Sequence, residues 1–195
     1  MTSSLFEALA VDRTRAAAVE DANARLGALA TCGADGQPRV RTVVVHAVAD
    51  DALLLLISRH HGKWRQLAHE PRAELMIWWA AIGLQYRLAG LCEEAPPEVA
   101  EERWRRLPEA ARRLDLAYGP GFLPGDPVVD REIAREQVER RSAPLDTSAM
   151  PAHVCALRLR LTEIERLALS PGDRVHDRRR AVRVAGAWKT TTLVP

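Results

Sequence analysis

The feature that most limits the fold of this chain is a series of short apolar, β-type segments separated by turn residues. The turn Gly33-Ala-Asp-Gly-Gln-Pro38 joins two of these segments into a predicted hairpin. The βαβ alternation of a parallel nucleotide-binding sheet is absent. We therefore predict a mainly β fold, a small antiparallel barrel of roughly six to eight strands with flanking helices. The predicted strands are 28–32, 39–48, 52–58, 73–79, 84–93, 153–160, 162–169 and 180–194, the last range with a turn at Gly186.

Helices are expected between the strands. The pair Ser3-Ser4 is a typical cap for a helix that starts at Leu5, and residues 16–26 continue in helical composition. Further helices are predicted over 62–69, from Pro97 to about Leu116, and over about 130–141, with a glycine- and proline-rich loop over 118–129. Because the sequence contains no repeat and no internal linker, residues 1–195 are expected to form a single domain.

Composition excludes several classes of protein. Apolar residues make up 47% and charged residues 28%, which excludes a disordered tail. The apolar run Ala52–Ile57 is far shorter than the roughly 20 residues that span a membrane. No leader pattern opens the sequence, so we expect a cytoplasmic protein without a membrane partner. The net charge of +2 gives little support for nucleic-acid binding.

Several familiar catalytic and binding motifs are also missing. The sequence contains neither GxSxG nor GKS/T, so nothing points to a hydrolase or a nucleoside triphosphatase. The segment Gly119–Gly125 has the wrong spacing for a dinucleotide fingerprint and contains prolines. Three histidines, His60, His61 and His69, lack a ligand spacing, so we expect exposed histidines and no metal site.

Two cations favour a phosphate site. Arg41 lies inside an apolar strand, where an unpaired charge is costly, although a solvent-facing strand edge is an alternative. Lys63, one of only two lysines in the chain, stands at the start of a short helix, where backbone amides favour anions. Gln85 opens a strand, and its amide offers a donor and an acceptor to a planar heterocycle, or it is an ordinary surface glutamine.

A third group of basic residues lies near the end of the chain. Arg174, His176 and Arg178 occupy alternate positions and so face one side of an extended segment. Such a set suits a phosphate or carboxylate ligand. Together with Arg179, Arg180 and Arg183 it is equally a solvated basic patch.

The order of these motifs is similar to that of a known family. Along the chain come Arg41-Thr-Val-Val-Val-His46, Gly62-Lys63, Leu84-Gln85-Tyr-Arg87, Arg174-Val-His-Asp-Arg178 and a close with Trp188 and Leu193-Val-Pro195. From about Arg25 to Pro195 the sequence resembles the pyridoxamine 5′-phosphate oxidase family of flavin-binding split barrels.

The resemblance implies a homodimer that holds FMN between its two subunits. Arg41 and Lys63 would bind the FMN phosphate, and Gln85 would lie beside the flavin ring. Arg178 would match a flavin-contacting arginine, and Arg174 and His176 would lie on the substrate side. The backbone around the flavin would be that of Arg41, Thr42, Val43, Val44, Ile57 and Ser58. Oxidases of this family pass a hydride from substrate to flavin.

This sequence also departs from the family pattern. The lysine that binds the substrate phosphate corresponds to His46, which is mostly neutral at pH 7. Its three companions fall on Arg103, Leu107 and Ala111. A Gln-Ser flavin contact is missing from the Gly119–Gly121 loop, a tryptophan corresponds to Leu167, and an arginine corresponds to Gly62. The site for a B6 phosphate is thus largely lost, while His46 and Arg103 stay candidates for the substrate wall.

The prediction is therefore an FMN-dependent oxidoreductase that acts on a small molecule other than a B6 vitamer. No residue is assigned as a catalytic acid or base. A deazaflavin-dependent enzyme or flavin reductase of the same fold is an alternative, as is a non-catalytic flavin-binding protein. A nucleic-acid binder built on residues 174–183 has the least support.

Overall fold

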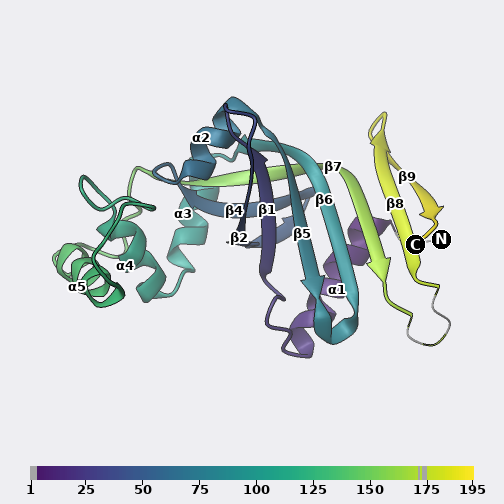
Figure 1. The fold of residues 1–195 in the computed structure, drawn as a ribbon, viewed down its shortest axis with the longest axis horizontal. Coiled ribbons are helices and arrows are strands. Elements are labelled where there is room, and N and C mark those ends of the chain that lie inside the picture. Colours follow the sequence, from purple (N-terminus) through teal and green to yellow (C-terminus); the bar gives the residue numbers. More distant parts are fainter. Residues whose placement is uncertain (1–3, 171, 173–174) are drawn as a thin grey trace.

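An antiparallel sheet that curls around one side of the core organises the chain (Figure 1). The computed structural model describes residues 4–170, 172 and 175–195. The sheet order is β2-β1-β5-β6-β7-β4-β3, and β8 pairs with both β7 and β9. The mainly β architecture is confirmed, although the described residues form nine strands instead of six to eight. These are β1 (Leu26–Cys32), β2 (Pro38–Val44), β3 (Ala47–Ala49), β4 (Ala52–Ser58), β5 (Arg72–Trp79), β6 (Leu84–Glu94), β7 (Val154–Ala168), β8 (Asp177–Val184) and β9 (Ala187–Leu193).

Helices flank this sheet. The α-helices of the described residues are α1 (Leu5–Ala18), α2 (Gly62–His69), α3 (Pro97–Arg105), α4 (Glu109–Ala117) and α5 (Arg131–Ser142). The cap of α1 is a capping box in which Ser4 Oγ accepts from the Glu7 amide and the Glu7 carboxylate accepts from the Ser4 amide. In Figure 1, α4 and α5 lie to one side, away from the curled sheet. Within the described part of the chain, no helix is long and apolar enough to cross a membrane.

Two predicted helices are wrong in extent. The stretch 16–26 is not a continuous helix, because α1 ends at Ala18 and Glu20 adopts a positive φ of 56°. The helix predicted from Pro97 to about Leu116 is two helices, α3 and α4. Pro108 lies between them and has no amide hydrogen to continue the first helix.

Strand β7 is a single element where two strands were predicted. It runs for 15 residues and pairs with β4 through its first half, with β6 over most of its length, and with β8 through its second half. The register between β6 and β7 shifts between Ala89 and Gly90. A Cβ at Gly90 would lie 2.0 Å from the Arg160 carbonyl oxygen, so this bulge requires glycine. The register skips Thr162 of β7 at this shift, close to the boundary between the two predicted strands 153–160 and 162–169.

A buried polar cluster ties α1 to the sheet. Tyr86 on β6 donates its hydroxyl hydrogen to Asp12 Oδ2 (2.6 Å), and Arg166 Nε on β7 donates to the same oxygen (3.0 Å). Asp12 is 8% exposed and Tyr86 is fully buried. Because buried polar groups are costly without partners, this cluster fixes the position of α1 on the core.

Candidate functional site

Arg41 extends from β2 to α2. Its guanidinium donates to the Leu29 carbonyl (3.1 Å), to Thr31 Oγ1 (2.5 Å) and to Gln66 Oε1 (2.6 Å). Thr31 in turn donates its hydroxyl to Gln66 Oε1 (2.7 Å). All three acceptors are neutral, so these bonds orient the guanidinium without cancelling its charge. Arg41 is therefore a half-buried, positioned cation and not a solvent-facing residue at a strand edge.

Lys63 lies near Arg41 in the first turn of α2. Burial, and then the charge of Arg41, lower the pKa of Lys63 to about 8, while Asp115 on α4 acts in the opposite direction. Burial also raises the pKa of Asp115 to about 6, against the effect of Lys63. In the described structure the Lys63 ammonium makes no hydrogen bond or close ion pair. The start of α2 thus holds two cations whose mutual repulsion an anion would relieve.

The backbone around Arg41 and Lys63 is buried at the end of β4 and has uncapped amide groups at the start of α2. Ile57 and Ser58 end β4 and are 5% and 0% exposed, and Ser58 Oγ accepts from the His60 amide (3.1 Å). The N-cap of α2, His61, makes no capping bond with its side chain, so the first amides of the helix stay available to an anion. The prediction that His60 and His61 are exposed is wrong, since both are half-buried.

An organic phosphate fits this end of the molecule. Arg41, Lys63 and the uncapped α2 amides supply positive charge, and Gly62 adds no side chain to obstruct them. Of the other residues expected near a flavin on β2, Thr42 and Val44 are exposed on one face of the strand. Val43 points into the core and is 8% exposed.

Gln85 and Arg178 belong to a second group. Gln85 on β6 lies opposite Leu167 on β7, which lies opposite Arg178 on β8, so the three side chains form one row across the sheet. Trp78 on β5 extends the row on the other side of Gln85. Arg178 is held by the buried carboxylate of Glu165, whose Oε1 accepts from Nε (3.0 Å).

The two groups lie on opposite faces of the sheet. Arg41 is paired with Leu29, Leu29 with Leu75, and Leu75 with Leu88, so these four residues share the face that is buried in the core. Gln85 precedes Leu88 by three residues and therefore lies on the other face. The described chain does not bring the predicted phosphate-binding and ring-contacting residues together.

The candidate substrate residues are only partly brought together. Burial, followed by the charges of Arg25, Arg103 and Arg13, lowers the pKa of His46 to about 4, so this histidine is neutral at pH 7. The predicted residues His46 and Arg103 are thus neighbours. One ring nitrogen of His176 already has a hydrogen-bond partner, because its Nδ1 accepts from the Ser170 amide (3.2 Å). Arg174 lies outside the described residues.

A cavity of about 430 Å³ adjoins His46. Val44 and His46 line it together with Leu107 and Ala111, the positions where the family phosphate site was expected to be lost. Its wall is therefore largely apolar. The sequence did not identify Arg25, which lines this cavity, or Arg13, whose charge helps to lower the pKa of His46 in the cavity wall. Among so many arginines, no local pattern marks these two.

Comparison with known proteins agrees with the resemblance found in the sequence. A sequence profile of pyridoxamine 5′-phosphate oxidase matches residues 15–124, more than half of the chain. This chain belongs to the pyridoxamine 5′-phosphate oxidase family. A pyridoxine/pyridoxamine 5′-phosphate oxidase of Anaeromyxobacter dehalogenans is 32% identical, over 93% of this chain and 90% of the relative. A dihydrophenazinedicarboxylate synthase of Pseudomonas chlororaphis is 30% identical, over 86% of this chain and 73% of the relative.

Solved structures confirm the split-barrel fold. PhzG from Burkholderia lata 383, in complex with tetrahydrophenazine-1-carboxylic acid, matches all of this chain and 94% of its own, with a TM-score of 0.88 and 24% identity. A pyridoxamine 5′-phosphate oxidase-related, FMN-binding protein from Nostoc punctiforme matches over the full length of both chains, with a TM-score of 0.80 and 21% identity. Because family members with different names are similarly related to this chain, membership alone does not identify the reaction.

Proposed function

We propose that this protein binds FMN and is an oxidoreductase that exchanges a hydride between the flavin and a small molecule. The observation that carries this proposal is the pair Arg41 and Lys63, two adjacent cations without a bonded carboxylate at the start of α2. A phosphate group there gains charge-assisted hydrogen bonds and the favourable field of the helix end. The relation to an FMN-binding protein of the same fold supports the choice of cofactor.

The residues of this chain would bind and orient the cofactor, which supplies the redox chemistry when it is bound. Arg41, positioned by Thr31 and Gln66, and Lys63 would hold the phosphate. Gln85 would direct its amide toward the edge of the ring, and Arg178, fixed by Glu165, would add a positive charge beside it. No side chain is assigned to proton transfer.

We also propose that the site is completed in a homodimer, with one group of residues from each subunit. This follows from the placement of Arg41 and Gln85 on opposite faces of the sheet. The face that carries Gln85 also has exposed apolar side chains suited to burial against a second copy, namely Val40, Val44, Met76 and Leu91.

The substrate that we propose is not a B6 phosphate. His46 is neutral at pH 7, and Leu107 and Ala111 present apolar surface where that phosphate would need donors. The name of the dihydrophenazinedicarboxylate synthase and the ligand of PhzG indicate that related proteins form or bind carboxylated phenazine-type rings. We propose a small ring compound of comparable size for this chain. A cytoplasmic location stays a prediction.

The absorption spectrum of the purified protein, with mass spectrometry of the cofactor released by heat, tests the proposal. Flavin absorption and the mass of FMN are expected. Lys63→Ala is expected to weaken FMN binding by about 1–3 kcal/mol, because it removes a charge-assisted bond to the phosphate. Lys189→Ala, which removes the other lysine at an exposed site on β9, is the matched control and is expected to have no effect.

The remaining outcomes separate the alternatives. A colourless protein that takes up no FMN from excess contradicts the proposal, and uptake of a deazaflavin instead would favour the deazaflavin-dependent alternative. A bound flavin that dithionite reduces, but that no electron donor or acceptor turns over, would favour a non-catalytic flavin-binding protein.

A further inference from the structure

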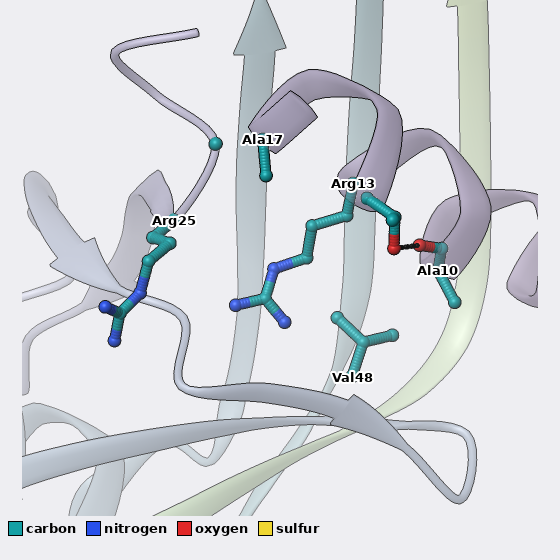
Figure 2. Close-up of a pocket in the computed structure, with 7 residues that line it drawn as sticks. Ala10, Arg13, Ala17, Arg25 and Val48 are labelled. Atoms are coloured by element: carbon teal, nitrogen blue, oxygen red, sulfur yellow. Dashed lines mark hydrogen bonds between the residues drawn. The ribbon is translucent and has the colours of Figure 1, made fainter. Parts of the chain in front are cut away.

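Two arginines that no family pattern assigns lie in one cavity beside α1. Arg13 projects from α1 and Arg25 from the segment before β1, and both line a cavity of about 400 Å³ with Ala17 and Val48. Figure 2 shows the two side chains running the same way from their separate backbone segments. Arg13 Nη2 donates to the Val45 carbonyl (2.8 Å), which fixes its direction. In the described chain the Arg25 guanidinium has no hydrogen-bond partner.

These arginines differ from most others in the protein. Seventeen close ion pairs join arginines to carboxylates among the described residues, but Arg13, Arg25 and Arg103 take part in none of them. The pairs involve Arg39, Arg59, Arg72, Arg87, Arg105, Arg106, Arg113, Arg131, Arg135, Arg160, Arg166, Arg178, Arg179, Arg180 and Arg183.

One acidic residue lines the adjoining cavity, but its oxygens are already used. Asp21 Oδ1 accepts from the Asn23 amide (2.8 Å), and Asp21 Oδ2 accepts from the Ala81 amide (2.8 Å). It therefore fixes the backbone between α1 and β1 and forms no close ion pair with the arginines. The cluster of Arg13, Arg25 and Arg103 keeps an excess of positive charge.

The electrostatics of the cluster agree with its geometry. Burial, followed by the charges of Arg25 and Arg103, lowers the pKa of Arg13. The same arginines help to keep His46 neutral, so His46 adds no further charge. Repulsion of this kind in a partly buried region is relieved when an anion binds.

Arg25 also connects the two cavities, because it lines both. On one side stands Arg13, and on the other an apolar wall made of Leu26, Val44, Leu107, Pro108 and Ala111. A ligand that suits both cavities has an apolar body and an anionic group. Val44 lies three residues along β2 from Arg41 and projects from the opposite face, the face that carries Gln85, so this ligand would share that face of the sheet with the proposed ring-contacting residues.

We propose that Arg13 and Arg25 form an anion subsite that binds the carboxylate or phosphate group of the substrate, with the apolar body of the substrate against Leu107 and Ala111. The inference rests on the proposed function only in assigning this anion to the substrate. Guanidinium groups suit either anion, because their paired donors match two oxygens at once.

Calorimetric titration of the purified protein, with whatever cofactor it carries, tests the subsite. The probes are 2-naphthoate, benzoate and inorganic phosphate. We expect 2-naphthoate to bind more tightly than benzoate, because its larger apolar body covers more of the wall. Arg25→Gln and Arg13→Gln are each expected to weaken the binding of the preferred anion by about tenfold or more, and Arg25→Lys by less. Arg15→Gln, at an exposed position on α1, is the matched control and leaves binding unchanged.

Each outcome has a defined meaning. Binding of the carboxylate probes, of phosphate or of both shows which anions the subsite accepts, and loss of that binding in the Arg13 and Arg25 variants supports the subsite. Absence of binding by all three probes, or equal binding by the variants and the wild type, overturns it. Flavin content and the thermal midpoint, measured on every variant, show that the fold is kept. A flavin-free protein that binds the anion through these arginines contradicts the proposed function but not the subsite. A flavin-loaded protein that binds no anion contradicts the subsite but not the proposed function.

Discussion

Arg41 and Gln85 project from opposite faces of one antiparallel sheet, although both were predicted to contact the same cofactor. The series of pairs Arg41–Leu29, Leu29–Leu75 and Leu75–Leu88 places Arg41 on the buried face. Because Gln85 is an odd number of residues from Leu88, it lies on the outer face. A small molecule bound against one face of this sheet therefore contacts only one of the two side chains.

A charge on the outer face is expected to disrupt the dimer and the flavin site together. Met76 is 37% exposed on this face, and Met76→Glu would place a charge in the proposed interface, where burial is costly. Light scattering after size-exclusion chromatography is expected to show a monomer that has lost its flavin, although Arg41 and Lys63 are intact. Val11→Glu, at a 66% exposed site on α1, should stay dimeric and yellow. A monomeric Met76→Glu protein with full flavin content would falsify the shared site.

FMN affinity is expected to decrease as the pH rises through about 8. The pKa of Lys63 is lowered to about 8 in the protein without ligand, so Lys63 is protonated below this pH and becomes neutral above it. The FMN phosphate stays a dianion over the same range, since its second pKa is near 6. Above pH 8, binding requires Lys63 to regain its proton, and affinity falls by up to about tenfold per pH unit. Fluorescence titration between pH 7 and 9.5 measures this, and Lys63→Arg should show a flat profile.

Removing the Tyr86 hydroxyl is expected to destabilise the protein. Tyr86 donates to Asp12 inside the cluster that joins α1 to the sheet. Tyr86→Phe leaves the buried carboxylate with one fewer donor and should lower the free energy of unfolding by about 1–3 kcal/mol in urea denaturation. The chain offers a matched control, because Tyr118 is its only other tyrosine and its hydroxyl makes no hydrogen bond to the described residues. An equal loss in Tyr118→Phe would contradict the role of the cluster.

Gly90→Ala is expected to disturb the join between β6 and β7. The added Cβ would lie 2.0 Å from the Arg160 carbonyl oxygen, which belongs to the backbone and cannot rotate away. We expect a loss of about 3 kcal/mol or more, or failure to fold, judged by thermal unfolding and yield. Gly62→Ala is the control, since its Cβ would meet nothing nearer than Gln66 Nε2 at 3.8 Å. Normal stability of Gly90→Ala would show that the bulge can relax.

The sequence predicted the strands better than the joins between them. Both ends of β4 (Ala52–Ser58) and of α2 (Gly62–His69) are where the pattern indicated, because an apolar run and a proline stop give local signals. The continuity of β7 was missed, because the register skips Thr162 of β7 at the bulge and the buried positions shift from Leu159 and Leu161 to Ile164. The alternation of β7 read alone resembles two strands, and the pairing with β6 that makes them one element cannot be read from its sequence.

In the candidate site, too, the sequence identified residues with a local signal and missed those defined by contacts between distant segments. Arg41 and Lys63 were found because a cation within an apolar strand and a rare lysine at a helix start are locally unusual. Arg13 and Arg25 were not found, because what distinguishes them is that they line one cavity and have no close carboxylate partner in three dimensions. No spacing along the chain reports that absence. The placement of Gln85 and Arg41 on opposite faces likewise depends on a register across four strands.

The two cavities near His46 have a consequence for how such proteins diversify. Most of their walls come from α1, from the segment before β1, and from Leu107, Pro108 and Ala111 around the junction of α3 and α4. The strands contribute Leu26, Val44 and Val48. The residues expected to hold the cofactor lie on β2, β4, α2, β6 and β8. Substitutions that alter what enters the cavities therefore leave the sheet register untouched. A lineage with this architecture can acquire a new substrate by exchanging a few side chains on its helices, while the residues of the proposed flavin site stay unchanged.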